Sequence, residues 1–219
     1  MIFHSRGRAL AVLSNFAPHV LTIGGRRFAC GEAYFHFAKF LAAATAAESP
    51  ERATALRAHA EQLADKPKLP PLTAKRLGGK GKPHGCRLEA AELAAWDAVR
   101  YDTQLALCRA LAHDAAGAVR TALLGTGRAT LVHFERGATA DSYWGGKVVA
   151  GGAVVGQNTL GKIWMRLRGE LAAATGAGGG AGAAVAAAGK RGRAETKEGV
   201  ATGGGTARAV PRRRTEAAP

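Results

Sequence analysis

The pattern of apolar and polar positions predicts a small hairpin followed by a helix near the N-terminus. Val20 to Ile23 and Arg26 to Phe28 form two short runs that suit strands, and Gly24-Gly25 between them can supply the positive φ angles of a tight turn. A helix is expected from about Gly31 to Ala44. Ser49-Pro50-Glu51 combines an N-cap, a proline in the first turn and an acid facing the helix dipole, so a second helix starts there. Its apolar positions recur at close to the helical period, at Ala53, Leu56, Ala60 and Leu63.

The rest of the chain predicts more helices and few strands. Prolines at 67–71 break the second helix, and residues 73–77 form a short segment that Gly78-Gly79 stops. We expect helices over 88–112, 118–124 and about 158–172, a strand over 130–134 and a glycine-rich loop over 145–156. The buried positions expected in the long helix are Trp96, Val99, Leu107 and Leu111.

This succession of elements indicates an α+β fold: a single compact, mostly helical domain with a few short strands over residues 1–172. From residue 173 the chain is rich in alanine and glycine and then in basic clusters. Such a segment has too few large apolar side chains to offset its ordering entropy, so residues 173–219 are expected to be a disordered tail.

The chain of 219 residues carries a net charge of +15, of which residues 176–219 contribute five. A positive surface attracts phosphates, nucleotides and nucleic acid without choosing among them. The basic clusters of the tail are typical of a nuclear address or a nucleic-acid tether, and a merely solvated tail is the simpler interpretation. Residues 171–189 are uncharged but too weakly apolar to span a membrane, so no membrane partner is expected.

Three scattered cysteines, Cys30, Cys86 and Cys108, form no metal-binding motif and no disulfide framework. A reducing compartment such as the cytoplasm fits this pattern. We expect no metal and no cofactor, and therefore an activity that survives a chelator.

The first candidate for chemistry is the predicted helix after Cys30. Glu32, His36 and Lys39 lie at i, i+4 and i+7 and so share a helical face, with aromatic residues on the other sides. A carboxylate near a helix N-terminus and backed by rings suits a general acid or base, because desolvation and the helix dipole can tune its pKa. The simpler alternative is an exposed stripe of weak ion pairs.

The second candidate is Asp141-Ser142-Tyr143-Trp144-Gly145. A tryptophan beside an aspartate on a loop can stack on a base while the carboxylate binds a polar group, although both rings can instead simply cover the core. Asn158 can cap the last helix beside an anion. The third candidate is the basic stretch 74–82 with Lys75 and Arg76, which resembles a phosphate cradle but lacks the P-loop pattern. A solvated basic loop is its simplest reading.

Together these segments resemble the NADAR (YbiA-like) family from about Phe3 to Leu171. The matching motifs, in order, are Leu13-Ser14-Asn15-Phe16, Glu32 with Tyr34-Phe35 and Lys39-Phe40, Ala74-Lys75-x-Leu77-Gly78, Asp141-x-Tyr143-Trp144-Gly145, Asn158-x-Leu160-Gly161 and Met165-Arg166-Leu167-Arg168. Each motif is weak alone, and several in register are specific.

The resemblance implies a hydrolase that cleaves the N-glycosidic bond of ribosyl compounds. The characterised substrates of the family are phosphorylated ribosylaminopyrimidine intermediates of riboflavin synthesis, or ADP-ribose on guanosine in nucleic acid. By this resemblance Glu32, Asp141 and Lys75 are the expected catalytic residues. The expected substrate contacts are Asn15, Phe16, Tyr34, Lys39, Arg76, Tyr143, Trp144 and Asn158.

The chain also departs from the family pattern. Ala33 stands where a histidine usually follows the glutamate, and His36 and Ala38 stand where glutamines are usual. His133 replaces an acid, with Glu135 nearby, and an insertion lengthens the segment between Gly145 and Asn158. These changes leave the substrate and the level of activity open.

Two carboxylates, Glu32 and Asp141, can divide the work of cleaving the bond, as in glycosidases. Alternatively Lys75 or Lys39 attacks the sugar carbon and forms a Schiff base, which requires a lysine with a lowered pKa. Two further classes remain open for the whole chain: a non-catalytic module that reads ADP-ribose or a nucleotide, and a nucleic-acid-binding protein.

Overall fold

The computed structural model describes residues 1–3, 10–81, 85–114, 116–174 and 176. They all belong to one compact unit, Met1–Gly179. The predicted disordered tail falls almost entirely on residues 177–219, outside the described residues, and the final helix runs on to Ala174.

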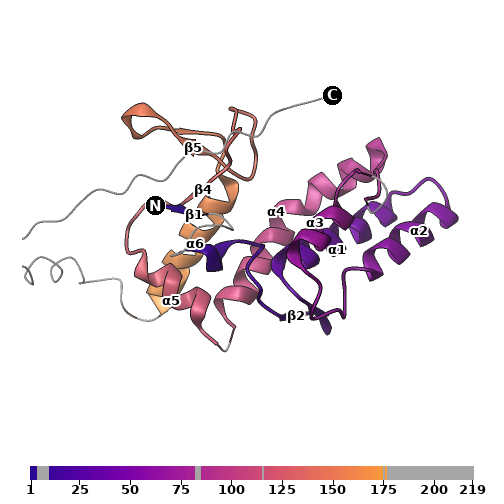
Figure 1. The fold of residues 1–219 in the computed structure, drawn as a ribbon, viewed down its shortest axis with the longest axis horizontal. Coiled ribbons are helices and arrows are strands. Elements are labelled where there is room, and N and C mark those ends of the chain that lie inside the picture. The colour runs from indigo at the N-terminus through magenta and orange to yellow at the C-terminus, as the bar shows by residue number, and fades with distance from the viewer. Residues whose placement is uncertain (4–9, 82–84, 115, 175, 177–219) are drawn as a thin grey trace, which may run out of the picture. The chain divides into compact units, whose positions relative to one another are not determined.

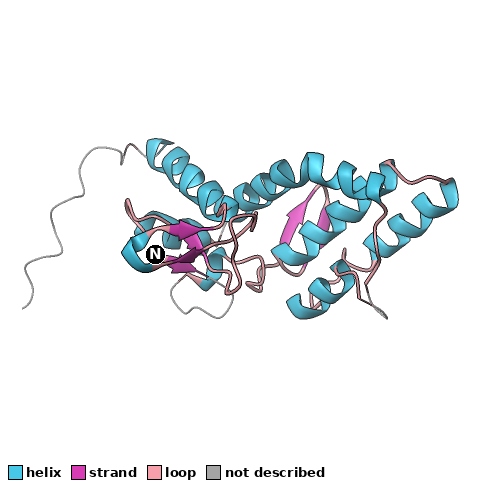
Figure 2. Ribbon diagram, turned by 90° about the horizontal axis from the view of Figure 1, so that it is seen from above, coloured by secondary structure: helices cyan, strands magenta, loops and turns pink. Residues whose placement is uncertain are grey.

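Helices account for most of the described chain, as Figure 2 shows. They are α1 (Gly31–Thr45), α2 (Pro50–Glu61), α3 (Pro71–Gly78), α4 (Ala90–Ala112), α5 (Ala118–Gly125) and α6 (Thr159–Ala174), with 3₁₀ turns at Ala11–Leu13 and Ala150–Gly152. The expected mostly helical α+β domain is therefore confirmed.

The strands are short and pair two by two. β1 (Ile2–Phe3) lies parallel to β4 (Val132–His133), and the two are drawn side by side in Figure 1. β2 (Leu21–Ile23) and β3 (Arg26–Phe28) form the predicted hairpin, and β5 (Lys147–Val148) pairs antiparallel with β6 (Val154–Val155). Both turn glycines of the first hairpin, Gly24 and Gly25, have positive φ, as the sequence predicts.

Local signals in the sequence set the helix starts. The Ser49 hydroxyl accepts a hydrogen bond from the Arg52 amide at 3.1 Å and so caps α2, which begins at Pro50. A capping box begins α4, because Glu89 and Glu92 each accept from the other's backbone amide. These caps fix where α2 and α4 begin, and both helices pack against α1.

The core is built around α1, which packs against α2, α3 and α4. Large aromatic side chains from distant segments fill it, and Phe3, Phe28, Phe40 and Trp164 are fully buried. The Trp164 indole N–H donates to the Leu13 carbonyl at 3.0 Å, which satisfies its polar edge. This bond also ties α6 to the segment 13–16, one of the family motifs.

Four expectations about elements need correction. Val99 is 41% exposed and is not among the buried residues of the long helix α4, so it is not part of the core. The basic stretch around Lys75 is not a loop but the helix α3. The insertion over 145–156 is not an open loop, since it folds back on itself as β5 and β6. The strand expected over 130–134 is limited to Val132–His133, with a bridge from Phe134 to Gly146.

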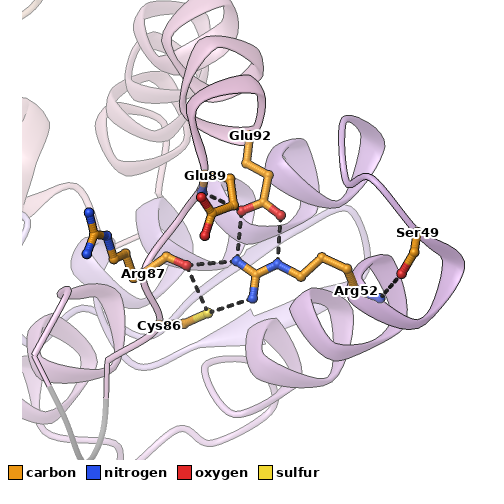
Figure 3. A network of polar contacts seen from close by, with 6 residues as sticks. All are labelled: Ser49, Arg52, Cys86, Arg87, Glu89 and Glu92. Carbon is orange, nitrogen blue, oxygen red and sulfur yellow. Dashed lines mark hydrogen bonds and ion pairs between the residues drawn. The ribbon is translucent and has the colours of Figure 1, made fainter.

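A buried ion pair joins α2 to α4 (Figure 3). Glu92 is 1% exposed, and its two oxygens accept from Arg52 Nε at 2.7 Å and Nη2 at 2.8 Å. Arg52 Nη2 also donates to the Arg87 carbonyl at 2.7 Å, so the guanidinium holds the segment before α4 in place. The hydrogen bond from Arg52 lowers the pKa of Glu92.

Candidate functional site

A cavity of about 340 Å³ opens among α1, α3, α4, β4 and the segment before β5. These elements come from all parts of the domain, as their colours in Figure 1 show. Side chains of mixed character line it: Ser14, Asn15, Phe16, Glu32, Phe35, His36, Lys75, Gly79, Gln104, His133, Trp144 and Leu160. Its size and its few polar groups among apolar walls are typical of a small-molecule site.

Glu32 and His36 form the part of the cavity wall that contains the carboxylate. Glu32 lies in the first turn of α1 and is 9% exposed, and its Oε1 is 3.2 Å from His36 Nε2 one turn later. The Glu32 amide donates to the Asn15 carbonyl at 2.9 Å, which fixes the start of the helix against the segment 13–16. The alternative of an exposed stripe is therefore wrong, since Glu32 is buried and His36 is half-buried.

Two lysines lie near this carboxylate in different settings. Lys75 is on α3, lines the cavity, and has its ammonium 5.3 Å from the centre of the Phe16 ring. Lys39 is on α1 and donates to the Gly78 carbonyl at the end of α3. Burial lowers the pKa of Lys39 to about 8, and nearby Cys86 and Glu32 oppose that shift.

Aromatic side chains form another part of the cavity wall. Trp144 meets the edge of Phe35 with ring centres 5.4 Å apart, and Phe35 meets Trp96 of α4 at 4.9 Å. Trp144 also contacts Tyr143, with ring centres 4.7 Å apart, and the guanidinium of Arg100 lies 3.9 Å from the centre of the Tyr143 ring. Trp144 thus packs on Phe35 of α1, and its neighbours Phe35 and Tyr143 contact Trp96 and Arg100 of α4, so it does not project from a free loop.

A pair of amides closes another side of the cavity. The side chains of Asn15 and Gln104 exchange two hydrogen bonds, each of 3.0 Å, and Gln104 is only 1% exposed. The sequence contains a signal for Gln104 that we did not use. It lies three, four and seven residues before buried Leu107, Cys108 and Leu111, so the helical period places a polar amide on the apolar face of α4.

The fold brings together four of the predicted residues besides Glu32: Asn15, Phe16, Lys75 and Trp144. The cavity therefore brings the first-helix acid, the tryptophan segment and a basic side chain together. Sequence reasoning placed His36 on the face of Glu32 without giving it a role, and it did not include His133, Gln104 or Leu160 among the site residues.

The other predicted residues lie outside the cavity wall as the structure describes it. Asp141 and Arg76 are exposed to solvent. Tyr34 packs edge-on against Phe28 at 5.3 Å, and burial raises the pKa of its hydroxyl. Tyr143 is not among the lining residues, and its ring contacts Trp144, which is.

Asn158 does not line the cavity and instead makes hydrogen bonds within the fold. It is buried, has a φ of 51°, accepts from the His133 amide at 3.0 Å and donates to the Leu131 carbonyl at 2.8 Å. Its side chain therefore fastens the start of α6 to β4. Because Asn158 binds the His133 amide, it also fixes the position of His133, whose side chain lines the cavity.

In the part of the chain that the structure describes, no cluster of three or more His, Cys, Asp or Glu side chains has a metal-binding arrangement. Within the same residues, none of the helices combines the length and the apolar character needed to cross a bilayer.

The comparisons with known proteins identify the family of this chain. The NADAR domain profile matches residues 2–172, so the chain belongs to the NADAR family, which is linked to N-glycosidase activity. The NMR structure of the E. coli protein YbiA is similar to this fold, with a TM-score of 0.51 and 25% sequence identity over 80% of this chain and 86% of that chain. No curated protein sequence matches this chain significantly.

Proposed function

We propose that this protein is an N-glycosidase that hydrolyses the bond between ribose C1 and the nitrogen of a base in a phosphorylated ribosyl compound. One observation carries the proposal: a buried carboxylate, an aromatic wall and a lysine, contributed by Glu32, Trp144 and Lys75, line the same cavity. The substrate class is either a ribosylaminopyrimidine phosphate or an ADP-ribosylated guanosine.

Cleavage of a ribosyl C1–N bond passes through a state with positive charge on the sugar, as in glycosidases. A carboxylate beside C1 stabilises that charge and aims a water molecule at the carbon. Glu32 fits this role, because it is the only carboxylate among the described residues that line the cavity. Asp141, exposed and outside the wall, fits a role at most on a part of the substrate that extends beyond the cavity.

The remaining groups suit the two ends of the substrate. The Trp144 ring, fixed edge-on by Phe35, gives a rigid surface on which a base can stack. Lys75 supplies a positive charge for a phosphate, and exposed Arg76 on the next position of α3 can add a second one for a longer phosphate chain. Asn15 and Gln104 hydrogen-bond to each other, and the Asn15 amide, which lines the cavity, can offer its second N–H to a ribose hydroxyl.

A Schiff-base route needs a lysine that lines the cavity and also has a lowered pKa. Each of the two lysines meets only one of these two conditions. Lys75 lines the cavity, whereas Lys39 has the lowered pKa but donates its hydrogen bond to the Gly78 carbonyl. The geometry therefore favours the carboxylate route.

The experiment is incubation of the purified full chain with a ribosylaminopyrimidine phosphate and, separately, with ADP-ribosylated guanosine nucleic acid. We expect mass spectrometry to show the free base or the restored guanosine, together with the ribose phosphate or ADP-ribose. Binding of both compounds without product would instead identify a reader module. An affinity for unmodified nucleic acid that falls steeply with salt, and does so also after deletion of residues 176–219, would favour a nucleic-acid-binding protein.

A further inference from the structure

His36 directly contacts the Glu32 carboxylate, and the proposed function gives His36 no role. Its Nε2 lies 3.2 Å from Glu32 Oε1, and the two side chains are only 14% and 12% exposed. Both line the cavity. Because they are one turn apart on the rigid helix α1, the contact is built into the helix and needs no rearrangement of a loop.

The other ring nitrogen shows which tautomer fits the site. His36 Nδ1 is buried and has no hydrogen-bond partner among the described residues. A proton on Nδ1, in the neutral Nδ1–H form or in the imidazolium, would bury an N–H donor without an acceptor. The neutral Nε2–H form leaves only an unpaired lone pair at Nδ1, and it directs its single N–H to the Glu32 carboxylate.

Close packing fixes the ring in that orientation. α3 approaches His36 so closely that a Cβ on Gly78 would lie 2.1 Å from His36 Cγ and 2.3 Å from Nδ1. The Phe35 ring meets the imidazole edge at a centre distance of 5.6 Å. Lys39 holds the same end of α3 through the Gly78 carbonyl, and His59 Nε2 lies 2.9 Å from the Leu77 carbonyl. The ring therefore has little room to rotate away from Glu32.

We propose that His36, as the neutral Nε2–H tautomer, is a positioning residue that holds Glu32 as an oriented carboxylate anion. The consequence for catalysis rests on the proposed function. Glu32 then begins the reaction ionised, as a proton acceptor that also stabilises positive charge, and not as the acid that protonates the leaving nucleobase. The charged or titratable groups near this carboxylate are Lys39 and Cys30 around α1, Lys75 of α3 and His133 of β4.

The balance of the reaction follows from this assignment. The C1–N bond breaks with its electron pair going to the base nitrogen, and the oxygen of water bonds to C1. Glu32 takes one proton from that water, and this proton returns through Glu32 or solvent to the base nitrogen. No further reactant is needed.

The first test needs no substrate. Imidazole ¹⁵N NMR of the full chain at pH 7, with the His36 signals assigned by their loss in His36→Gln, is expected to show a neutral ring protonated at Nε2. A ring protonated at Nδ1, or an imidazolium, would overturn the proposal. Because this readout is independent of turnover, it decides the tautomer even if neither candidate substrate is cleaved, an outcome that would count against the proposed function alone.

The second test compares His36→Gln, which keeps an N–H donor, with His36→Leu, which does not. Loss of a hydrogen bond to a charged group should lower kcat/KM of His36→Leu by about 10- to 100-fold and move the acidic limb of its pH profile to higher pH. His36→Gln should restore most of the rate and the original limb. Equal losses in both variants with an unmoved limb, in proteins that melt like the wild type, would show that His36 only fills space.

Discussion

The ion pair between Arg52 and Glu92 leads to a strong prediction about stability. In Arg52→Met the Glu92 carboxylate stays buried and keeps only its hydrogen bond from the Glu89 amide at 2.8 Å. It loses both guanidinium bonds, and the Arg87 carbonyl loses its Arg52 donor and keeps the weak contact from the Cys86 thiol at 3.7 Å (Figure 3). Methionine preserves most of the apolar stem, so the change reports mainly on charge.

The size of the effect follows from the burial of the two partners. Removing one partner of a buried pair typically costs about 3–5 kcal/mol, because a charge remains without compensation. The Arg52 side chain is 31% exposed whereas that of Glu92 is 2% exposed, so water can reach the vacated space in part. We therefore expect a loss of unfolding free energy at the lower end, about 3 kcal/mol.

Urea denaturation at pH 7, followed by circular dichroism, measures this loss. The matched control is Arg166→Met, which removes a surface pair with Glu170 at 2.9 Å whose side chains are 51% and 43% exposed. That change should cost about 0–1 kcal/mol. A loss in Arg52→Met no larger than in the control would refute the reasoning.

The pH dependence gives a second check on the same variant. The pKa of Glu92 is lowered in the folded state, chiefly by Arg52, so its contribution is complete above the pKa of the unfolded chain and is lost as the pH falls. The difference between the wild type and Arg52→Met should therefore shrink from about pH 5 to pH 3. A difference that stays constant over this range would contradict the assignment to Glu92.

Three further predictions concern Lys39, Trp144 and Ser49. The pKa of Lys39 is lowered to about 8 by burial, so above pH 8 the unfolded chain binds a proton that the folded chain has lost. In urea denaturation the wild type should therefore gain stability relative to Lys39→Met between about pH 8 and pH 10. Trp144→Ala should weaken substrate binding by about 1–3 kcal/mol in calorimetry while Trp144→Phe retains most of it, and equal affinities would exclude stacking. Ser49→Ala removes the cap of α2 and should lower the unfolding free energy by about 1 kcal/mol, whereas no change would show that the Arg52 amide finds water instead.

The helices and the first hairpin could be read from the sequence because their signals are local. Ser49 and Pro50 mark the start of α2, and Gly24 and Gly25 mark the turn between β2 and β3. The pairing of β1 with β4 could not be predicted in this way, because it joins residues about 130 positions apart through two-residue strands. The glycines of the insertion indicated a loop, yet the valines between them pair as β5 and β6.

The site could be predicted only in part for a similar reason. Glu32 and Trp144 were identified from their motifs, and the spacing on α1 correctly placed Glu32 and His36 on one face. Gln104 was missed because a polar residue in a long helix is usually exposed, and its burial depends on its contact with Asn15. The surroundings of Asp141 and Asn158 depend on tertiary packing, which their motifs do not encode.

The central claim is that the ribosyl bond is cleaved beside the buried carboxylate of α1. Single-turnover kinetics on Glu32→Gln, with Asp141→Asn as the partner variant, tests it most directly. We expect Glu32→Gln to bind substrate almost normally but to lose about 10²–10⁴-fold in rate, while Asp141→Asn stays near the wild type. A Glu32→Gln protein that releases the base at the wild-type rate would contradict the account.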